Sequence, residues 1–267
     1  MMNSSNMESG FVFAWSTIKD YLDRLVPVKD GFSAALKGSV TLPNGKIVFI
    51  KMGTDEATNY HTQEETMVYE LLTSLNFPFV PKLIAHSPDK TKIALQALTP
   101  DTGWSWPLIW TDIHLDKALN AMDALADIPL TETQATYLRS GRILSADDGG
   151  WQALVDSDDS QRFIRKILTD RNNAILVKNL DFSELATQEA SFKFIEDKLV
   201  HYDIRIYNSA WNQTRQTAYL VDLDWVALGD SRIAMALTLG DAQSTGLDVL
   251  HRYHSRLDTE ALRWVAG

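Results

Sequence analysis

The sequence predicts an α+β protein with two lobes, the first rich in strands and the second mainly helical. Strand-like segments dominate the first hundred or so residues, whereas helix-like periodicity dominates after Thr99. The chain has 267 residues, which suits one large domain or two modest ones at about 150 residues per domain. We therefore expect a strand-rich lobe over residues 1–98 and a helical lobe over residues 99–267.

The first lobe opens with a short amphipathic helix over residues 14–25, which leads into a strand near 26–28. A hairpin follows, in which Asn44-Gly45 joins the strand around Val40 to the strand over 47–52. Asn-Gly between two β-rich runs is a strong hairpin signal, because glycine accepts the positive φ that a tight turn requires.

A helix and one more strand complete the predicted first lobe. Apolar residues recur at the i, i+3, i+4, i+7 spacing of one buried stripe, at Val68, Leu71, Leu72 and Leu75. Residues 93–98 then read as a strand. In the second lobe, helical patterns cover 112–126, 160–176, 183–199 and 246–266, and short strands are expected at 199–200 and 219–222.

Composition excludes several classes of protein. Cysteine is absent, which rules out disulfides, thiolate metal sites and cysteine nucleophiles. The net charge of −10 disfavours binding to nucleic acid or to an anionic membrane, and would suit a cationic small molecule. No Lys or Arg precedes Lys19 and no apolar run approaches the ~18 residues of a membrane span, so we expect a cytoplasmic protein.

The chemistry is concentrated between residues 199 and 230. Asp203 follows His201 by two residues, Asn208 follows Asp203 by five, and Asp222 lies fourteen residues further on. This is the spacing of a kinase catalytic loop and its metal-binding aspartate. Phosphoryl transfer needs a carboxylate beside the attacking hydroxyl, which Asp203 supplies, and oxygen ligands for Mg²⁺, which Asn208 and Asp222 supply.

Asp224 lies two residues after Asp222, so on a strand both carboxylates would face the same side. Two interpretations of Asp224 are equally open: a second metal ligand, or a solvated or arginine-paired acid.

These segments resemble the aminoglycoside phosphotransferase and choline kinase-like family of small-molecule kinases. Bacterial members read H-G-D-x-R-x-x-N, then V-D-W-x-W-A and G-D; here HYDIRIYN stands at 201–208 and VDLDWVALGD at 221–230. The resemblance extends over about residues 28–235. It implies a two-lobed protein-kinase-like fold, with a small antiparallel-sheet N-lobe and a mainly helical C-lobe.

The resemblance also implies a strand lysine and a helix glutamate in the first lobe. Lys51 would reach the α- and β-phosphates of a nucleotide, and Glu65 would orient its ammonium. Glu64, one residue earlier, is the alternative candidate for this glutamate. A solvated Lys51 and a capping box from Thr62 to Glu65 are the competing structural interpretations.

The remaining nucleotide contacts are expected on either side of these residues. Gly31 and Ser33 occupy the place of the phosphate-covering loop, and backbone groups from Gln96 to Leu98 would hold the adenine. Mg-ATP is therefore the implied cofactor.

The implied function is an ATP- and Mg-dependent phosphotransferase acting on a hydroxyl of a small cationic molecule, such as an aminoglycoside, macrolide or choline-like amine. The alternative is a catalytically weak, kinase-like nucleotide-binding module. Two departures favour that alternative: Tyr202 replaces the usual glycine, and 233–235 lacks the acid that steadies the loop. A protein kinase is disfavoured, because Asp222-Leu223-Asp224 replaces D-F-G.

Three tryptophans follow the predicted lobe boundary, at Trp104, Trp106 and Trp110. They could form an aromatic wall for a cationic substrate. Packing within a core is the competing interpretation, and it is the more frequent use of such residues.

Overall fold

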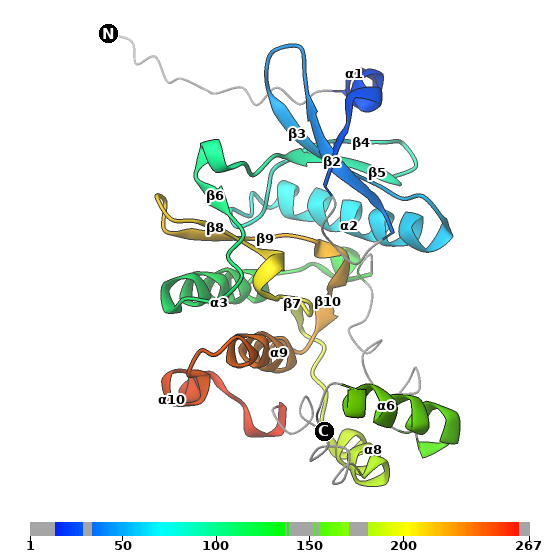
Figure 1. Cartoon of the computed structure of the whole chain (residues 1–267), viewed down its shortest axis with the longest axis vertical. Coiled ribbons are helices and arrows are strands. Elements are labelled where there is room, and N and C mark those ends of the chain that lie inside the picture. Colours follow the sequence, from blue (N-terminus) through cyan, green and yellow to red (C-terminus); the bar gives the residue numbers. More distant parts are fainter. Residues whose placement is uncertain are drawn as a thin grey trace. The chain divides into compact units, whose positions relative to one another are not determined.

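The computed structural model describes residues 14–28, 34–136, 138, 152, 155–170 and 181–261 (Figure 1). The chain divides into two compact units. The first is Met1–Ser105 with Val221–Asp224, and the second is Trp106–Leu220 with Trp225–Gly267. The short segment Val221–Asp224 thus packs with the first unit although it lies far along the chain, whereas the lobe limits of 1–98 and 99–267 stay a prediction.

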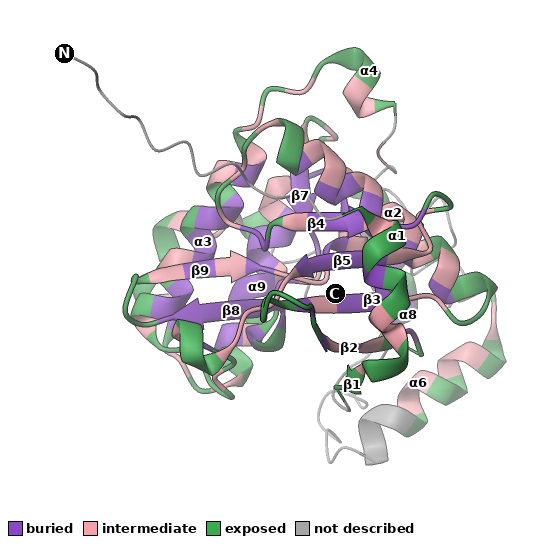
Figure 2. Cartoon of the chain, turned by 90° about the horizontal axis from the view of Figure 1, so that it is seen from above, coloured by how far each residue is buried: buried purple, intermediate pink, exposed green. Residues whose placement is uncertain are grey.

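An antiparallel sheet of five strands forms the centre of the first unit, in the order β1-β2-β3-β5-β4. The turn between β2 and β3 contains Gly45 at a φ of 80°, as the Asn-Gly signal predicts. The central strands β3 and β5 are largely buried (Figure 2). The strands are β1 (Val26–Pro27), β2 (Leu36–Thr41), β3 (Ile47–Met52), β4 (Leu83–His86) and β5 (Lys92–Gln96).

Helices cover both faces of this sheet. On one face, the helix α1 (Trp15–Ile18), continued by the 3-10 helix η1 (Lys19–Arg24), packs against alternate residues of the sheet such as Val48 and Ile50. The other face carries Lys51, whose side chain meets the helix α2 (Glu56–Ser74). The period-2 alternation of β3 therefore decides that its lysine faces α2.

The helix α2 begins earlier than a capping box at Thr62 would allow. Asp55 is its N-cap and accepts a hydrogen bond from the Thr58 backbone N–H at 2.8 Å. Thr62 lies in the second turn and donates to the Thr58 carbonyl at 2.7 Å. The interpretation of Thr62 and Glu65 as a capping box is therefore wrong, and Glu65 lies in the interior of the helix.

The second unit combines helices with two strand pairs. β7 (Lys198–His201) pairs antiparallel with β10 (Val226–Gly229), and β8 (Ser209–Asn212) pairs antiparallel with β9 (Thr217–Leu220). The helices are α3 (Asp112–Ala126), α4 (Glu132–Ala135), α6 (Asp158–Asp170), α8 (Phe182–Ser191), α9 (Ser231–Ser244) and α10 (Val249–Arg252). Its 3-10 turns are η5 (Ile206–Asn208) and η7 (His254–Arg256). The first unit also contains η2 (Pro100–Thr102), β6 (Trp104–Ser105) and the first two residues of η6 (Leu223–Trp225).

The predicted boundaries hold best where the periodicity is strong. The helix expected over 112–126 is α3 with the same limits. The helix expected over 183–199 ends at Ser191, because β7 begins at Lys198. Residues 171–176 of another predicted helix lie outside the described residues. Among the residues that are described, no helix is both long and apolar enough to cross a membrane.

Candidate active site

Lys51 is the centre of a buried ion-pair network in the first unit. It lies one residue before the end of β3 and is 2% exposed. Its Nζ lies 2.7 Å from Glu65 Oε2 and 2.5 Å from Asp222 Oδ1. A buried ammonium is costly unless it is paired, so these two carboxylates are what allow a lysine to occupy this position.

The network keeps Lys51 charged. Burial alone lowers the pKa of Lys51, but the neighbouring carboxylates of Glu65, Asp222 and Asp224 outweigh it and raise the pKa above its ordinary value. Lys51 is therefore a fixed positive charge at neutral pH, as a group that neutralises phosphate must be.

Glu65 joins two parts of the site. Its Oε2 faces Lys51, while its Oε1 accepts a hydrogen bond from the Leu223 backbone N–H at 3.2 Å. The side chain is only 2% exposed. The glutamate that orients Lys51 is thus Glu65, and the neighbouring Glu64 is partly exposed on α2.

Asp222 and Asp224 do not lie on a strand. β9 ends at Leu220, Asp222 has a φ of 59°, and Asp224 lies in η6. The expectation that the two carboxylates share one face of a strand is wrong, because the left-handed residue ends the extended path. The turn nevertheless brings Asp224 Oδ2 to 4.0 Å from Lys51 Nζ.

The partners of Asp224 are cationic or can become so. Besides Lys51, the His61 Nδ1 lies 3.8 Å from Asp224 Oδ2, and the Asp224 side chain is 13% exposed. Asp224 is therefore mostly buried beside Lys51 and His61, and its role in metal binding stays a prediction.

Lys37 is a cation that the sequence interpretation passed over. Its Nζ lies 3.6 Å from Asp222 Oδ2. The observed register places Lys37 on β2 directly opposite Lys51 on β3. A two-residue turn at Asn44-Gly45 would instead pair Lys51 with Gly38, so the sequence signal alone does not reveal this partner.

The residues of the predicted catalytic loop lie in the second unit. Asp203 follows β7, and its Oδ1 lies 2.7 Å from Arg205 Nε. Asn208 Nδ2 donates to Asp203 Oδ2 at 2.9 Å and to the Asp203 carbonyl at 2.8 Å. Because the amide nitrogen faces Asp203, Asn208 would bind a metal through its amide oxygen.

An acid that the sequence interpretation missed holds this loop. Asp241 on α9 accepts hydrogen bonds at Oδ2 from the Ile206 backbone N–H at 3.0 Å and from Trp110 Nε1 at 2.8 Å. Asp241 lies eleven residues after Asp230, outside the stretch 233–235 where the family resemblance places such an acid. Because Asp241 lies this far along the helix α9, a short sequence motif could not reveal it.

Tyr202 points into the interior. Its ring is 6% exposed, and its hydroxyl accepts a hydrogen bond from the Asp230 backbone N–H at 2.8 Å. The ring packs on Gly229, where an added Cβ would lie 2.0 Å from the hydroxyl oxygen. Tyr202 therefore fills space that a glycine of β10 leaves open, whereas the side chain of Asp203 is 28% exposed.

The other predicted nucleotide contacts are less constrained. Gly31 and Ser33 lie outside the described residues. Gln96 ends β5 and donates its backbone N–H to the Lys82 carbonyl at 2.8 Å, and Leu98 follows as a partly exposed residue. Their predicted contact with adenine stays a prediction.

The tryptophans after β5 divide between core and surface. Trp104 and Trp110 are 1% and 4% exposed, whereas Trp106 is 43% exposed. Packing therefore accounts for two of the three, and only Trp106 presents an aromatic surface.

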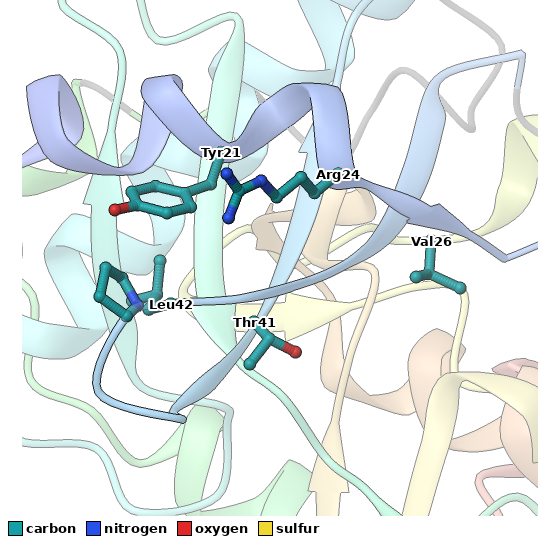
Figure 3. A pocket seen from close by; sticks show the side chains of 6 residues that line it. Tyr21, Arg24, Val26, Thr41 and Leu42 are labelled. Atoms are coloured by element: carbon teal, nitrogen blue, oxygen red, sulfur yellow. The ribbon is translucent and has the colours of Figure 1, made fainter.

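A pocket of about 480 Å³ lies elsewhere in the first unit (Figure 3). It opens beside η1, and Leu42 in its wall belongs to the apolar cluster around Ile18. Its lining residues are Tyr21, Arg24, Val26, Thr41, Leu42 and Pro43. None of them is a predicted site residue, so this pocket is distinct from the Lys51 network.

The oxygen ligands of the predicted site suit Mg²⁺, which protein side chains need not surround completely. Among the described residues, no group of three or more histidines or acids is arranged to hold a metal ion. Mg²⁺ is usually bound by one or two carboxylates together with phosphates and water, so a three-ligand cage is not required. Asp222 in the first unit and Asn208 in the second unit each carry an oxygen ligand of the type that Mg²⁺ prefers.

Comparison with known proteins supports the fold. No protein-family model matches the sequence, and no characterised protein matches it in a sequence search. Solved structures do match. The streptomycin–ATP–APH(2")-IIa ternary complex is 12% identical with a TM-score of 0.58, and the match covers 99% of this chain and 89% of that one.

Two further structures match over most of their length. Macrolide 2'-phosphotransferase type I is 15% identical, with a TM-score of 0.55 and coverage of 100% of this chain and 91% of that one. Choline kinase LicA from Streptococcus pneumoniae is 14% identical, with a TM-score of 0.51 and coverage of 89% and 75%. The chain has the α+β, two-lobed, kinase-like fold of these phosphotransferases, which confirms the predicted fold class.

Proposed function

We propose that this protein is an ATP- and Mg-dependent phosphotransferase that acts on a hydroxyl of a small molecule. The observation that carries the proposal is the network of Lys51, Glu65 and Asp222. A lysine that is 2% exposed and paired with two carboxylates is expensive to build for stability alone. It is instead the arrangement that phosphoryl transfer uses to hold a positive charge in a fixed place.

Each predicted site residue has a distinct role in this reaction. Lys51 binds the α- and β-phosphates, and Glu65 fixes its position. Asp203 accepts the proton of the attacking hydroxyl, while Arg205 and Asn208 hold its carboxylate. Asn208 and Asp222, with Asp224 as a further candidate, are the proposed metal ligands, and Mg²⁺ when bound offsets the negative charge of the phosphates.

The acceptor class is proposed from the neighbours and from charge. The structural neighbours include complexes with streptomycin and with kanamycin, a macrolide 2'-phosphotransferase and a choline kinase. The chain itself carries a net charge of −10. A cationic molecule that bears a hydroxyl is therefore the proposed acceptor.

A catalytically weak nucleotide-binding module is the second candidate. It drew support from Tyr202 and from the absent acid at 233–235. The inward position of the Tyr202 ring and the hydrogen bond from Ile206 to Asp241 weaken both arguments. An active enzyme is therefore the better proposal.

Replacement of Asp203 separates the two candidates. Asp203→Asn keeps the size of the side chain but removes its negative charge and its capacity to accept a proton. Because general-base catalysis contributes about 10²–10⁴-fold, turnover should fall on that scale. The affinity for Mg-ATP should change by less than about twofold, since Asp203 is assigned to the acceptor.

The measurement is phosphate transfer from ATP across a panel of aminoglycosides, macrolides, choline-like amines and sugars. Mg-ATP binding is followed in parallel by thermal unfolding, because a ligand of the native state raises its stability. A wild type that binds Mg-ATP yet transfers phosphate to no member of the panel would support the binding module instead. The absence of any shift at millimolar Mg-ATP would contradict both candidates.

A further inference from the structure

Lys37 faces the same side of the sheet as Lys51. The two residues are direct partners across the antiparallel pair of β2 and β3. Directly opposite residues in such a pair have Cβ atoms about 4.5–5.5 Å apart and project from one face. This is the face on which Glu65 lies, because Val48 and Ile50 point to the opposite, apolar face.

Two lysines directly opposite each other repel, so their pairing is unfavourable without an anion. Asp222 supplies that anion to both. Its Oδ1 lies 2.5 Å from Lys51 Nζ, and its Oδ2 lies 3.6 Å from Lys37 Nζ. The Lys37 side chain is 14% exposed, so it lies along this face instead of extending into water.

Lys37 is not needed to orient Lys51. Glu65 and Asp222 already flank Lys51, so the orientation of Lys51 does not need a second ammonium beside Asp222. Two ammonium groups on one face are suited to a ligand with several negative oxygens, since each is a compact charge with three hydrogen-bond donors.

We propose that Lys37 is a second phosphate-binding residue, which acts with Lys51 on the polyphosphate of a nucleotide. The inference rests on the proposed function and deepens it, because it assigns this protein a preference for nucleoside triphosphates over monophosphates. Asp222 then has two states: it is the counter-ion of both lysines without ligand, and it is released from them when phosphate oxygens replace its carboxylate.

The competing explanation is that Lys37 only positions Asp222. A positioning role affects every nucleotide alike, whereas a phosphate-binding role grows with the number of phosphates. Affinities for adenosine, AMP, ADP and ATP therefore distinguish the two.

The experiment is titration calorimetry in Mg²⁺ with the whole chain carrying Lys37→Met. We expect the affinity for ATP to fall about tenfold or more, as for a lost charge-assisted hydrogen bond. The loss should be smaller for ADP and within about twofold for AMP and adenosine. Lys37→Arg should keep most of the ATP affinity, because its guanidinium still donates to phosphate.

Lys46→Met is the matched control. Lys46 is exposed at the β2–β3 turn, five residues before Lys51 and thus about 16 Å away along the strand. It removes the same charge from the same hairpin and should leave all four affinities unchanged. Thermal unfolding reports whether each variant folds, and Lys37→Gln replaces Lys37→Met if the latter does not.

The outcomes separate this inference from the proposed function. If the wild type binds ATP but Lys37→Met weakens all four ligands equally, or none of them, the assignment of Lys37 is wrong and the proposed function stands. If the wild type binds no nucleotide, both are overturned.

Discussion

Asp222 combines a functional charge with an unusual backbone. Its φ of 59° lies in the left-handed region, which residues other than glycine rarely adopt. Aspartate and asparagine tolerate this region best, because their short polar side chains form local hydrogen bonds. Replacement by asparagine therefore removes the charge of Asp222 and keeps its backbone conformation, so this position offers a test of a single charge.

Asp222→Asn should remove most of the activity while the protein still folds. The variant loses the counter-ion of Lys51 and Lys37 and a proposed metal ligand, so turnover should fall about 10²-fold or more. The free energy of unfolding should fall by about 1–3 kcal/mol, because buried Lys51 loses one of its two counter-ions and Lys37 loses its anion, while Glu65 still pairs with Lys51.

Steady-state transfer and urea unfolding measure the two effects separately. Asp222→Ala serves as the comparison, since alanine fits a positive φ less well than asparagine and should cost additional stability. Near wild-type turnover of Asp222→Asn at saturating Mg-ATP would show that Asp222 is not a metal ligand.

At this scale, the sequence predicts residues whose role is tied to a local pattern. Asp203 and Asn208 could be proposed because the loop holds them five residues apart, and Lys51 because the family resemblance implies a lysine on the strand after the hairpin. Lys37 and Asp241 could not be found in that way. Their roles arise from pairing across strands and from packing of a distant helix, which no short spacing encodes.

At the scale of elements, the same lesson applies to helices. The β2–β3 hairpin was predictable because Asn44-Gly45 separates two β-rich runs, and α3 because its apolar residues recur at helical spacing. The helix α9 was missed. Its buried residues, including Ile233, Met235 and Leu239, lie on several sides, so its sequence lacks the contrast that marks an amphipathic helix.

Two glycines test how elements pack, because the same substitution should act in opposite directions. Gly229→Ala in β10 places a Cβ 2.0 Å from the Tyr202 hydroxyl and 2.8 Å from its Cζ. Overpacking of this kind should lower the free energy of unfolding by about 1–3 kcal/mol. Gly240→Ala lies in α9, where an added Cβ would have nothing within 4 Å. This substitution should raise the free energy of unfolding by about 0.5–1 kcal/mol.

Urea unfolding of both variants checks this prediction. Tyr202→Phe combined with Gly229→Ala should recover part of the loss, because the hydroxyl is removed while Cζ stays close. Equal effects of the two alanines would mean that the Tyr202 ring does not pack on Gly229.

At the scale of the whole molecule, stability depends on a histidine that must stay neutral. His114 on α3 is fully buried between the rings of Trp110 and Trp211, at centroid distances of 4.7 and 5.2 Å. Its Nε2 lies 2.9 Å from Ser209 Oγ, and its Nδ1 has no hydrogen-bond partner among the described residues. A second proton on the ring would therefore be buried without an acceptor.

Burial accordingly lowers the pKa of His114 from 6.5 to about 4, which links folding to pH. Between these values the unfolded chain binds a proton at this residue and the folded chain does not. The contribution of His114 is therefore fully present above pH 6.5 and is lost as the pH falls toward 4. At 1.36 kcal/mol for each pH unit, the loss amounts to about 3 kcal/mol.

The comparison of wild type with His114→Gln isolates this effect, because glutamine can still reach Ser209 and does not titrate. Carboxylates that titrate over the same range contribute equally to both proteins and cancel in the difference. The free energies of unfolding, measured in urea from pH 7.5 to pH 4, should differ by a constant amount above pH 7. Below pH 6.5 the difference should shift in favour of the variant, by up to about 3 kcal/mol. A difference that does not vary with pH would show that His114 takes up its proton in the folded protein as readily as in the unfolded chain.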